Sequence, residues 1–193
     1  MTNQALLRHK TGDYGRHAED WYVEPGWTWD VLFDKVPFVG SALDPACGGG
    51  TGLDALRRHG FDPLGSDIVD RGCGAHIHDF LEPDYPLLAD NVITNPPYKL
   101  AEAFAERALE IGAKSVALLV PLPFLASQRR HALFARTPVA TVVILSRRPS
   151  MPPGGNVIEA KGGKEDYAWI VWRRWHRGPA AILWGMPNNK EEP

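Results

Sequence analysis

The sequence has 193 residues and a mass of 21.3 kDa, which suits one domain and excludes two enzymatic domains joined by a linker. Hydrophobic residues make up 44% and charged residues 23% of the chain, so the composition is globular rather than disordered or fibrous. No apolar run approaches the ~18 residues of a membrane span, and residues 1–10 lack the apolar core of a signal peptide. We therefore expect a cytoplasmic protein that does not bind membranes.

The formal net charge of -2 conceals an asymmetry along the chain. Residues 1–128 contain 10 Lys and Arg against 18 Asp and Glu, a net charge of -8. Residues 129–177 contain 10 against 3, a net charge of +7. The acidic part suits a cationic ligand and the basic segment suits a polyanion, although basic residues that merely solvate helix faces would give the same count.

Apolar runs alternate with helical patterns along most of the chain. The predicted strands cover residues 38–43, 62–67, 75–78, 91–94, 115–120, 139–145 and 167–172, and the predicted helices cover residues 52–59, 100–111 and 122–136. Alternating strands and helices predict an α/β fold with a Rossmann-like, doubly wound, mostly parallel seven-stranded sheet in a single domain. In the last strand we expect Tyr167, Trp169 and Val171 to share a face, and Trp169 and Trp172 to pack in the core.

The domain is expected to cover residues 20–185, between a flexible N-terminal arm at residues 1–19 and a flexible tail at residues 186–193. Within it, residues 147–165 contain three prolines and four glycines and show no hydrophobic period. Long loops of this kind in a compact domain are usually functional. We interpret this loop as a candidate recognition region.

The stretch from Asp44 to Gly52 places an acidic residue and four glycines where the first predicted strand turns into a helix. Ligands of open parallel sheets bind at the carboxyl ends of strands, and glycines let the backbone approach them. A dinucleotide fingerprint would need a third glycine where Leu53 stands, and a phosphate loop would need a lysine that is absent here. The turn therefore favours another nucleoside ligand.

Two further carboxylates follow predicted strands. Asp67 ends the second strand, where it can accept hydrogen bonds from ribose hydroxyls, and Asp79 follows the third strand, where it can accept from an adenine amino group while Phe80 lies against the ring. Three carboxylates at strand ends without a phosphate-binding lysine suit a positively charged nucleoside. S-adenosylmethionine is such a ligand.

The motif Asn95-Pro96-Pro97-Tyr98 directly follows the fourth predicted strand. An exocyclic amine on a purine is a poor nucleophile because its lone pair is delocalised into the ring. The side-chain oxygen of Asn95 and the carbonyl of Pro96 could accept its two N–H bonds and direct the lone pair at a methyl group, while Tyr98 stacks on the base. The two prolines restrict the backbone, so these acceptors need no reorganisation.

These motifs resemble those of the class I S-adenosylmethionine-dependent methyltransferases, and among them the DNA N6-adenine methyltransferases of the small prophage-encoded type. The resemblance covers about residues 20–175. It includes residues 21–25, similar to the motif that closes over the methionine end of the cofactor, with Glu24 where the family has Thr. The expected cofactor-binding residues are Tyr22, Pro25, Asp44, Pro45, Ala46, Cys47, Gly48, Gly50, Asp67, Ile68, Asp79, Phe80 and Asn95.

The resemblance implies methyl transfer from S-adenosylmethionine to the exocyclic N6 amine of adenine in DNA, with Asn95, Pro96, Pro97 and Tyr98 as catalytic residues. The adenine must be flipped out of a duplex or met unpaired. A recognition loop of this length predicts a short or relaxed target sequence. The expected substrate-binding residues are Tyr98, Arg147, Arg148, Lys161 and Lys164.

Other interpretations stay open. The same motif could methylate adenine in RNA or a glutamine amide in a protein, and a non-catalytic module could use the fold to bind DNA or a partner protein. The basic segment favours a nucleic acid over a protein but does not separate DNA from RNA. We expect a monomer or a weak homodimer. No metal is expected, since the spacing of Cys73, His76, His78 and Asp79 matches no standard zinc pattern.

Overall fold

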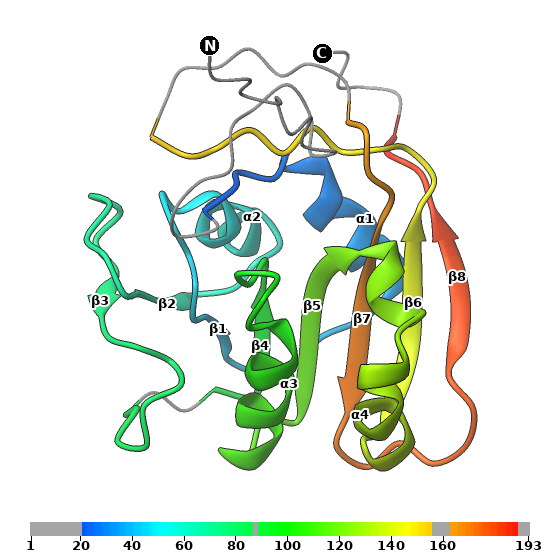
Figure 1. The fold of residues 1–193 in the computed structure, drawn as a ribbon. Helices are drawn as coiled ribbons and strands as arrows, with labels where there is room; N and C mark the ends of the chain where they lie inside the picture. The colour runs from blue at the N-terminus through cyan, green and yellow to red at the C-terminus, as the bar shows by residue number, and fades with distance from the viewer. Residues whose placement is uncertain (1–20, 87–88, 156–162, 189–193) are drawn as a thin grey trace, which may run out of the picture.

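The computed structural model describes residues 21–86, 89–155 and 163–188. Within them, eight strands form one sheet in the order β3-β2-β1-β4-β5-β7-β6-β8 (Figure 1). The strands are β1 (Ala42–Asp44), β2 (Pro63–Asp67), β3 (His76–Ile77), β4 (Asn91–Thr94), β5 (Ser115–Pro121), β6 (Val139–Leu145), β7 (Tyr167–Arg173) and β8 (Ala181–Gly185). Only β7 runs antiparallel to its neighbours in this described sheet. The expected α/β fold with a mostly parallel sheet is confirmed, with eight strands rather than seven.

Helices cover both faces of the sheet (Figure 1). They are α1 (Trp27–Lys35), α2 (Thr51–Arg58), α3 (Ala101–Glu110) and α4 (His131–Arg136), with two short 3-10 helices, η1 (Leu122–Leu125) and η2 (Gln128–Arg130). Apolar residues of α1 and α2 pack against one face, and those of α3 and α4 against the other. No helix among the described residues is long and apolar enough to cross a membrane.

Strand β7 lies in the middle of the core. Tyr167, Trp169 and Val171 belong to the cluster beneath α1 and α2, whereas Ile170 and Trp172 belong to the cluster beneath α3 and α4. Both tryptophans are fully buried, and their ring N–H groups donate to the carbonyl of Thr28 and to the hydroxyl of Thr137, respectively. The predicted facing of this strand and the core position of its tryptophans are confirmed.

Two elements lie outside the sequence predictions. Helix α1 buries Trp27, Trp29 and Leu32, but its aromatic and β-branched composition is more typical of strands. Strand β8 lies at the edge of the sheet and leaves Ile182 and Trp184 more than half exposed, so it lacks the alternation of buried and polar residues by which a strand is recognised.

The predicted helix over residues 122–136 is wrong as a continuous element. It is divided into η1, η2 and α4. Ala126, with φ -107° and ψ 56°, leaves the helical region, and Ser127, with φ -130° and ψ 123°, is extended. The chain therefore turns twice before α4 begins.

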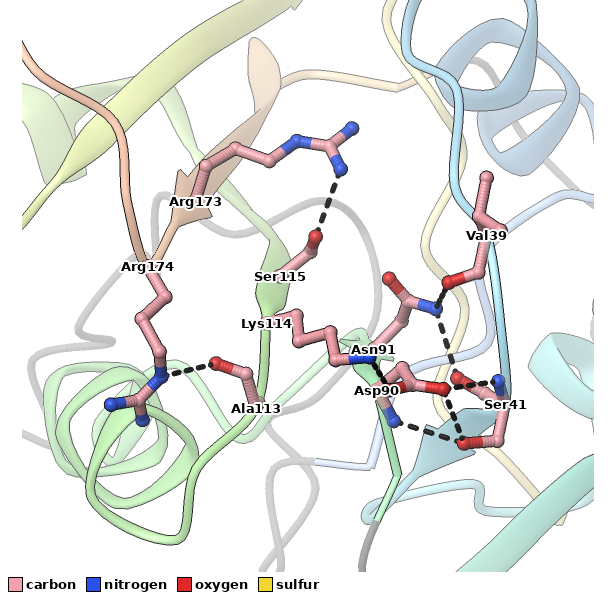
Figure 2. A network of polar contacts seen from close by, with 9 residues as sticks. All are labelled: Val39, Ser41, Asp90, Asn91, Ala113, Lys114, Ser115, Arg173 and Arg174. Carbon is pink, nitrogen blue, oxygen red and sulfur yellow. Dashed lines mark hydrogen bonds and ion pairs between the residues drawn. The ribbon is translucent and has the colours of Figure 1, made fainter.

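A polar network joins the amino-terminal ends of the central strands (Figure 2). The side-chain NH2 of Asn91 donates to the carbonyls of Val39 and Ser41, at 3.0 and 2.9 Å. The carboxylate of Asp90 accepts from the backbone N–H of Ser41 at 3.0 Å and pairs with Lys114 at 2.7 Å. These contacts link the starts of β1, β4 and β5. Because the three strands are parallel, the network also fixes their register at the opposite, carboxyl ends.

Two arginines of the basic segment belong to this end of the sheet (Figure 2). Arg173 donates to the hydroxyl of Ser115 at 2.9 Å, and Arg174 donates to the carbonyl of Ala113 at 3.1 Å. They serve the fold at the end remote from the predicted site. The basic residues of the segment therefore do not form a single surface.

Candidate active site

The residues predicted to bind the cofactor meet at the carboxyl ends of β1, β2 and β4. The chain adds β2 and β3 on one side of β1, and β4 and β5 on the other, so β1 lies at the topological switch point where ligands of such sheets bind. A cavity opens there. The predicted residues that line it are Tyr22, Asp44, Pro45, Ala46, Cys47, Gly48, Asp67, Ile68, Asp79, Phe80, Asn95 and Pro97, whereas Pro25, Gly50, Pro96 and Tyr98 stand outside the lining.

The glycine-rich turn after β1 forms the floor of the cavity. Gly48 and Gly50 have φ values of 53° and 96°, in the left-handed region that side chains rarely adopt. The N–H of Gly48 donates to Oδ2 of Asp67 at 2.9 Å, which ties the turn to the end of β2. Gly50 precedes α2 and faces Cys73, so it shapes the turn from behind the cavity.

Asp79 and Phe80 line the cavity beyond β3. Oδ1 of Asp79 accepts from the backbone N–H of Leu81 at 2.9 Å, which fixes its carboxylate in a turn. Phe80 is 1% exposed and packs edge-on against Tyr85, with ring centroids 5.0 Å apart. The predicted adenine-binding pair is thus anchored on both sides by the fold.

The cavity is strongly acidic. Glu24, Asp44 and Asp67 are all buried. Burial, together with the like charges of the nearby Glu24 and Asp67 carboxylates, raises the pKa of Asp44 to about 8. Burial also raises the pKa of Glu24. A positively charged ligand would favour the ionised forms of these groups, so the lining is suited to a cation.

Asn95 follows β4 and is held by the segment at residues 21–25. Its Nδ2 donates to the carbonyl of Tyr22 at 3.1 Å and to Oε2 of Glu24 at 2.8 Å. Its Oδ1 is buried and has no hydrogen-bond partner within the described protein. Buried acceptors are usually paired, so an unpaired one beside a cavity indicates a place for a donor on a ligand.

The other residues of the predicted catalytic motif are Pro96, Pro97 and Tyr98, and they lie between the cavity and the buried aromatic residues beside it. Pro96 is buried and Pro97 lines the cavity. The ring of Tyr98 lies parallel to that of Tyr22, with an angle of 3° between the planes and 6.3 Å between the centroids. It also contacts the ring of Tyr167 at 5.8 Å. The ring of Tyr98 thus packs against the residue whose carbonyl accepts from the Asn95 amide.

The segment at residues 21–25 also pairs with the candidate recognition loop. The N–H of Val23 donates to the carbonyl of Pro152 at 2.9 Å, and the N–H of Gly154 donates to the carbonyl of Trp21 at 3.1 Å. The indole of Trp21 fills the space between Gly48 and Gly154, where an added Cβ would come within 2.5 and 2.1 Å of it. The cavity floor and the loop are thus in contact through one tryptophan.

Arg71 approaches the same tryptophan from the loop that follows β2. Its guanidinium stacks 3.9 Å from the centroid of the Trp21 ring, and its Nε lies 3.6 Å from Oδ1 of Asp67. Its side chain is 9% exposed. The sequence gives no signal for Arg71, a single basic residue in an acidic region, and Trp21 is recognisable only as the neighbour of Tyr22.

Three of the four predicted substrate-binding residues of the loop lie among the described residues. Arg148 forms an ion pair with Asp166 at 2.8 Å, and the guanidinium of Arg147 lies 6.0 Å from the ring of Trp27. Lys164 lies near the end of the loop, and Lys161 lies outside the described residues.

Pro25, which was predicted to bind the cofactor, lies outside the cavity lining. Its carbonyl accepts hydrogen bonds from the backbone N–H and the hydroxyl of Thr28, so it starts the turn into α1.

The cysteines and histidines near the cavity do not form a metal-binding cluster. Cys47 and Cys73 have their sulfur atoms 3.8 Å apart as free thiols, and burial raises the pKa of Cys47. His76 and His78 are more exposed, at the outer edge of the sheet. Across residues 21–86, 89–155 and 163–188, no three His, Cys, Asp or Glu side chains are placed to hold a metal ion.

No protein-family model matches the sequence, and no curated protein matches it in sequence. The fold does have relatives among solved structures. It is similar to a proposed class I S-adenosylmethionine-dependent methyltransferase from Listeria monocytogenes, with a TM-score of 0.57 and 15% identity over 91% of this chain and 68% of that one. A proposed RNA methyltransferase from Pyrococcus horikoshii has a TM-score of 0.57 and 15% identity over 76% of this chain and 80% of that one.

A third relative is the modification subunit of a proposed type I restriction enzyme from Vibrio vulnificus, with a TM-score of 0.53 and 14% identity over 88% of this chain. The match spans about half, 48%, of the length of that subunit. These similarities show that the chain has the fold of the class I S-adenosylmethionine-dependent methyltransferases.

Proposed function

We propose that this protein transfers a methyl group from S-adenosylmethionine to the N6 amine of adenine in DNA. The observation that carries the proposal is the Asn95 amide, whose oxygen is buried and unpaired beside an acidic cavity at the switch point of the sheet. The cavity lining supports a cationic nucleoside, and the fold is shared with proteins described as methyltransferases. DNA as the substrate class is supported by the resemblance of the Asn-Pro-Pro-Tyr motif and is compatible with the Vibrio modification subunit.

The chain's own residues would prepare the amine for reaction. S-adenosylmethionine, when bound, supplies an electrophilic methyl group on a positively charged sulfur. Oδ1 of Asn95 and the carbonyl of Pro96 accept the two N–H bonds of the amine, which localises its lone pair, and the rings of Tyr22 and Tyr98 offer apolar faces to the base. No base is needed before attack, because the amine becomes acidic only once it is methylated.

The proposal is tested by offering labelled S-adenosylmethionine with plasmid DNA, total RNA and cell protein in parallel, and identifying the modified nucleosides or residues by mass spectrometry. N6-methyladenine in DNA alone is the expected result. Label in RNA or in protein glutamine would keep the chemistry and replace the substrate. An absence of label together with an absence of cofactor binding would favour a non-catalytic binding module.

Arg71 is expected to bind the carboxylate of the cofactor. Four carboxylates and one cation, Arg71, lie among the described residues that line the cavity, and the cofactor carries one carboxylate that needs a positive partner. The variant Arg71→Met should weaken binding of S-adenosylmethionine by roughly tenfold to a hundredfold, the value of a charged hydrogen bond. Its affinity for decarboxylated S-adenosylmethionine should stay within about threefold of the wild-type value.

Calorimetric titration of both proteins with both ligands completes this thermodynamic cycle. An equal loss of affinity for the two ligands would contradict the prediction. Arg71 would then act only through its stacking on Trp21.

Arg147 and Arg148 are expected to contact DNA phosphates. Each protein–phosphate contact contributes about -0.9 to the slope of log affinity against log salt concentration. Replacing either arginine by glutamine should therefore make that slope for duplex DNA less negative by about 0.9. The matched control is Arg177→Gln, in the β7–β8 connection at the opposite end of the sheet, which should leave the slope unchanged. Equal slopes for all three variants and the wild type would show that the loop arginines do not contact phosphates.

A further inference from the structure

Glu24 is a buried carboxylate of the cavity to which the proposed chemistry gives no role. It is 7% exposed, and each of its carboxylate oxygens has a separate donor. Oε1 accepts from the indole N–H of Trp29 at 2.8 Å, and Oε2 accepts from Nδ2 of Asn95 at 2.8 Å. The carboxylate therefore bridges α1 and the loop that follows β4.

Trp29 makes this bridge rigid. Its side chain is fully buried and packs edge-on against Trp169, with ring centroids 5.0 Å apart. An indole nitrogen can only donate, so it fixes one carboxylate oxygen and directs the other toward Asn95. Glu24 thus has little freedom to change its distance to the amide.

The same contacts determine which way the Asn95 amide faces. Its Nδ2 meets two acceptors, the Glu24 carboxylate and the carbonyl of Tyr22. A flipped amide would place Oδ1 against both acceptors, with lone pairs facing lone pairs and no hydrogen bond on that side. The flip is therefore excluded while Glu24 is ionised, the form that a cation in the cavity favours, and in that form Oδ1 stays on the side where it has no partner in the protein.

The charge of Glu24 also changes the strength of the amide oxygen. Hydrogen bonds to an ionised acceptor are stronger than neutral ones, and bonds in series polarise one another at low dielectric. A carboxylate on the Nδ2 side shifts electron density toward Oδ1. The result is a better acceptor at the atom that the substrate amine is proposed to meet.

We propose that Glu24 is a positioning residue that locks the Asn95 amide with its oxygen toward the substrate and strengthens that oxygen as an acceptor. This inference rests on the proposed role of Asn95. Glu24 is also the residue of the 21–25 segment at which this sequence departs from the family that it resembles. At that position the structure has a carboxylate between two donors, the indole of Trp29 and the amide of Asn95.

The decisive experiment is a double-mutant cycle on methyl transfer. Glu24→Gln offers Asn95 an NH2 group or a neutral oxygen instead of a carboxylate, and we expect a roughly tenfold to hundredfold fall in kcat with a much smaller change in KM for DNA. If Glu24 acts through Asn95, adding Glu24→Gln to Asn95→Ala should cause no further fall. Multiplicative losses would overturn the proposal, because Glu24 would then act on something other than Asn95.

A second measurement does not depend on the substrate. The side-chain amide resonances of Asn95, identified by their loss in Asn95→Asp, should be shifted downfield and protected from solvent exchange in the wild type and should move in Glu24→Gln. The control Asp30→Asn removes a surface carboxylate of α1 that pairs with His59, and should leave both kcat and these resonances unchanged. Resonances at free-amide positions in the wild type would overturn the proposal even if Glu24→Gln fails to fold.

The two readouts separate the inference from the proposed function. If the wild type methylates RNA or protein instead of DNA, the cycle is measured on that substrate with the same expectation. If the wild type methylates nothing, the proposed function fails while the amide resonances still decide the role of Glu24.

Discussion

The variant Asn95→Ala should bind S-adenosylmethionine within about threefold of the wild-type affinity and lose methyl transfer by roughly a hundredfold to a thousandfold or more. The expected loss comes from the transition state, where the amide oxygen is proposed to accept an N–H bond that becomes more acidic as the methyl group is transferred. Cofactor affinity depends mainly on the carboxylates and the glycine turn, which the substitution leaves in place. Calorimetry and single-turnover methyl transfer measure the two quantities separately.

Asn91 provides a matched control on the same strand. It is 1% exposed and donates two hydrogen bonds, but it lies at the opposite end of β4 from the cavity (Figure 2). Asn91→Ala should lower the free energy of unfolding by about 1–3 kcal/mol, the value of two partly buried hydrogen bonds, and should keep kcat near the wild-type value. If Asn95→Ala instead retained turnover, or lost only stability in the way of Asn91→Ala, the catalytic role of Asn95 would be wrong.

The sequence predicted the location of the site because its signals are local. Asp44, Asp67 and Asn95 each directly end or follow a short apolar strand, and parallel strands bring their carboxyl ends to one edge whatever the details of packing. The glycine turn is equally local, since the residue type permits the left-handed conformations that Gly48 and Gly50 adopt. Such features need no knowledge of distant contacts.

The parts that were missed depend on contacts between distant segments. Glu24 stands between Tyr22 and Pro25 with no local sign that Trp29 and Asn95 will donate to it, 5 and 71 residues away. Arg71 acquires its position from Trp21, which reaches the site only because residues 21–23 pair with residues 152–154. The function of the basic segment could not be predicted from its net charge for the same reason. Arg173 and Arg174 donate to hydroxyl and backbone groups at the far end of the sheet, and these contacts depend on the fold.

The second large effect expected is a loss of stability with rising pH that originates at Asp44. Burial raises the pKa of this carboxyl from 3.8 to about 8 in the folded protein. Below pH 4 both the folded and the unfolded chain hold the proton, so Asp44 places no penalty on folding. Between pH 4 and pH 8 the unfolded chain releases the proton while the folded chain keeps it, and the free energy of unfolding falls by about 1.4 kcal/mol per pH unit. Above pH 8 both states are ionised and the contribution is constant.

The variant Asp44→Asn isolates this contribution. An asparagine keeps an acceptor for the backbone N–H of Ala46, which Oδ1 of Asp44 binds at 3.2 Å, but it cannot ionise. Urea titrations at intervals from pH 4 to pH 9 should show the wild type losing several kcal/mol relative to Asp44→Asn across that window. Parallel curves for the two proteins would mean that Asp44 is already ionised in the folded state.

The same carboxyl should couple cofactor binding to proton release. A positively charged ligand in the cavity favours the ionised form of Asp44, so S-adenosylmethionine binding near pH 7 should expel up to one proton per protein. Calorimetry in buffers of different ionisation enthalpy measures that number directly, and the expected value falls toward zero in Asp44→Asn. A wild-type protein that releases no proton would show that the cofactor's charge is neutralised elsewhere, with Glu24 and Asp67 the remaining buried carboxylates of the site. A cavity whose carboxyls ionise at a cost when it is empty, and more readily beside a cation, would itself favour S-adenosylmethionine over its product, in which the sulfur is neutral.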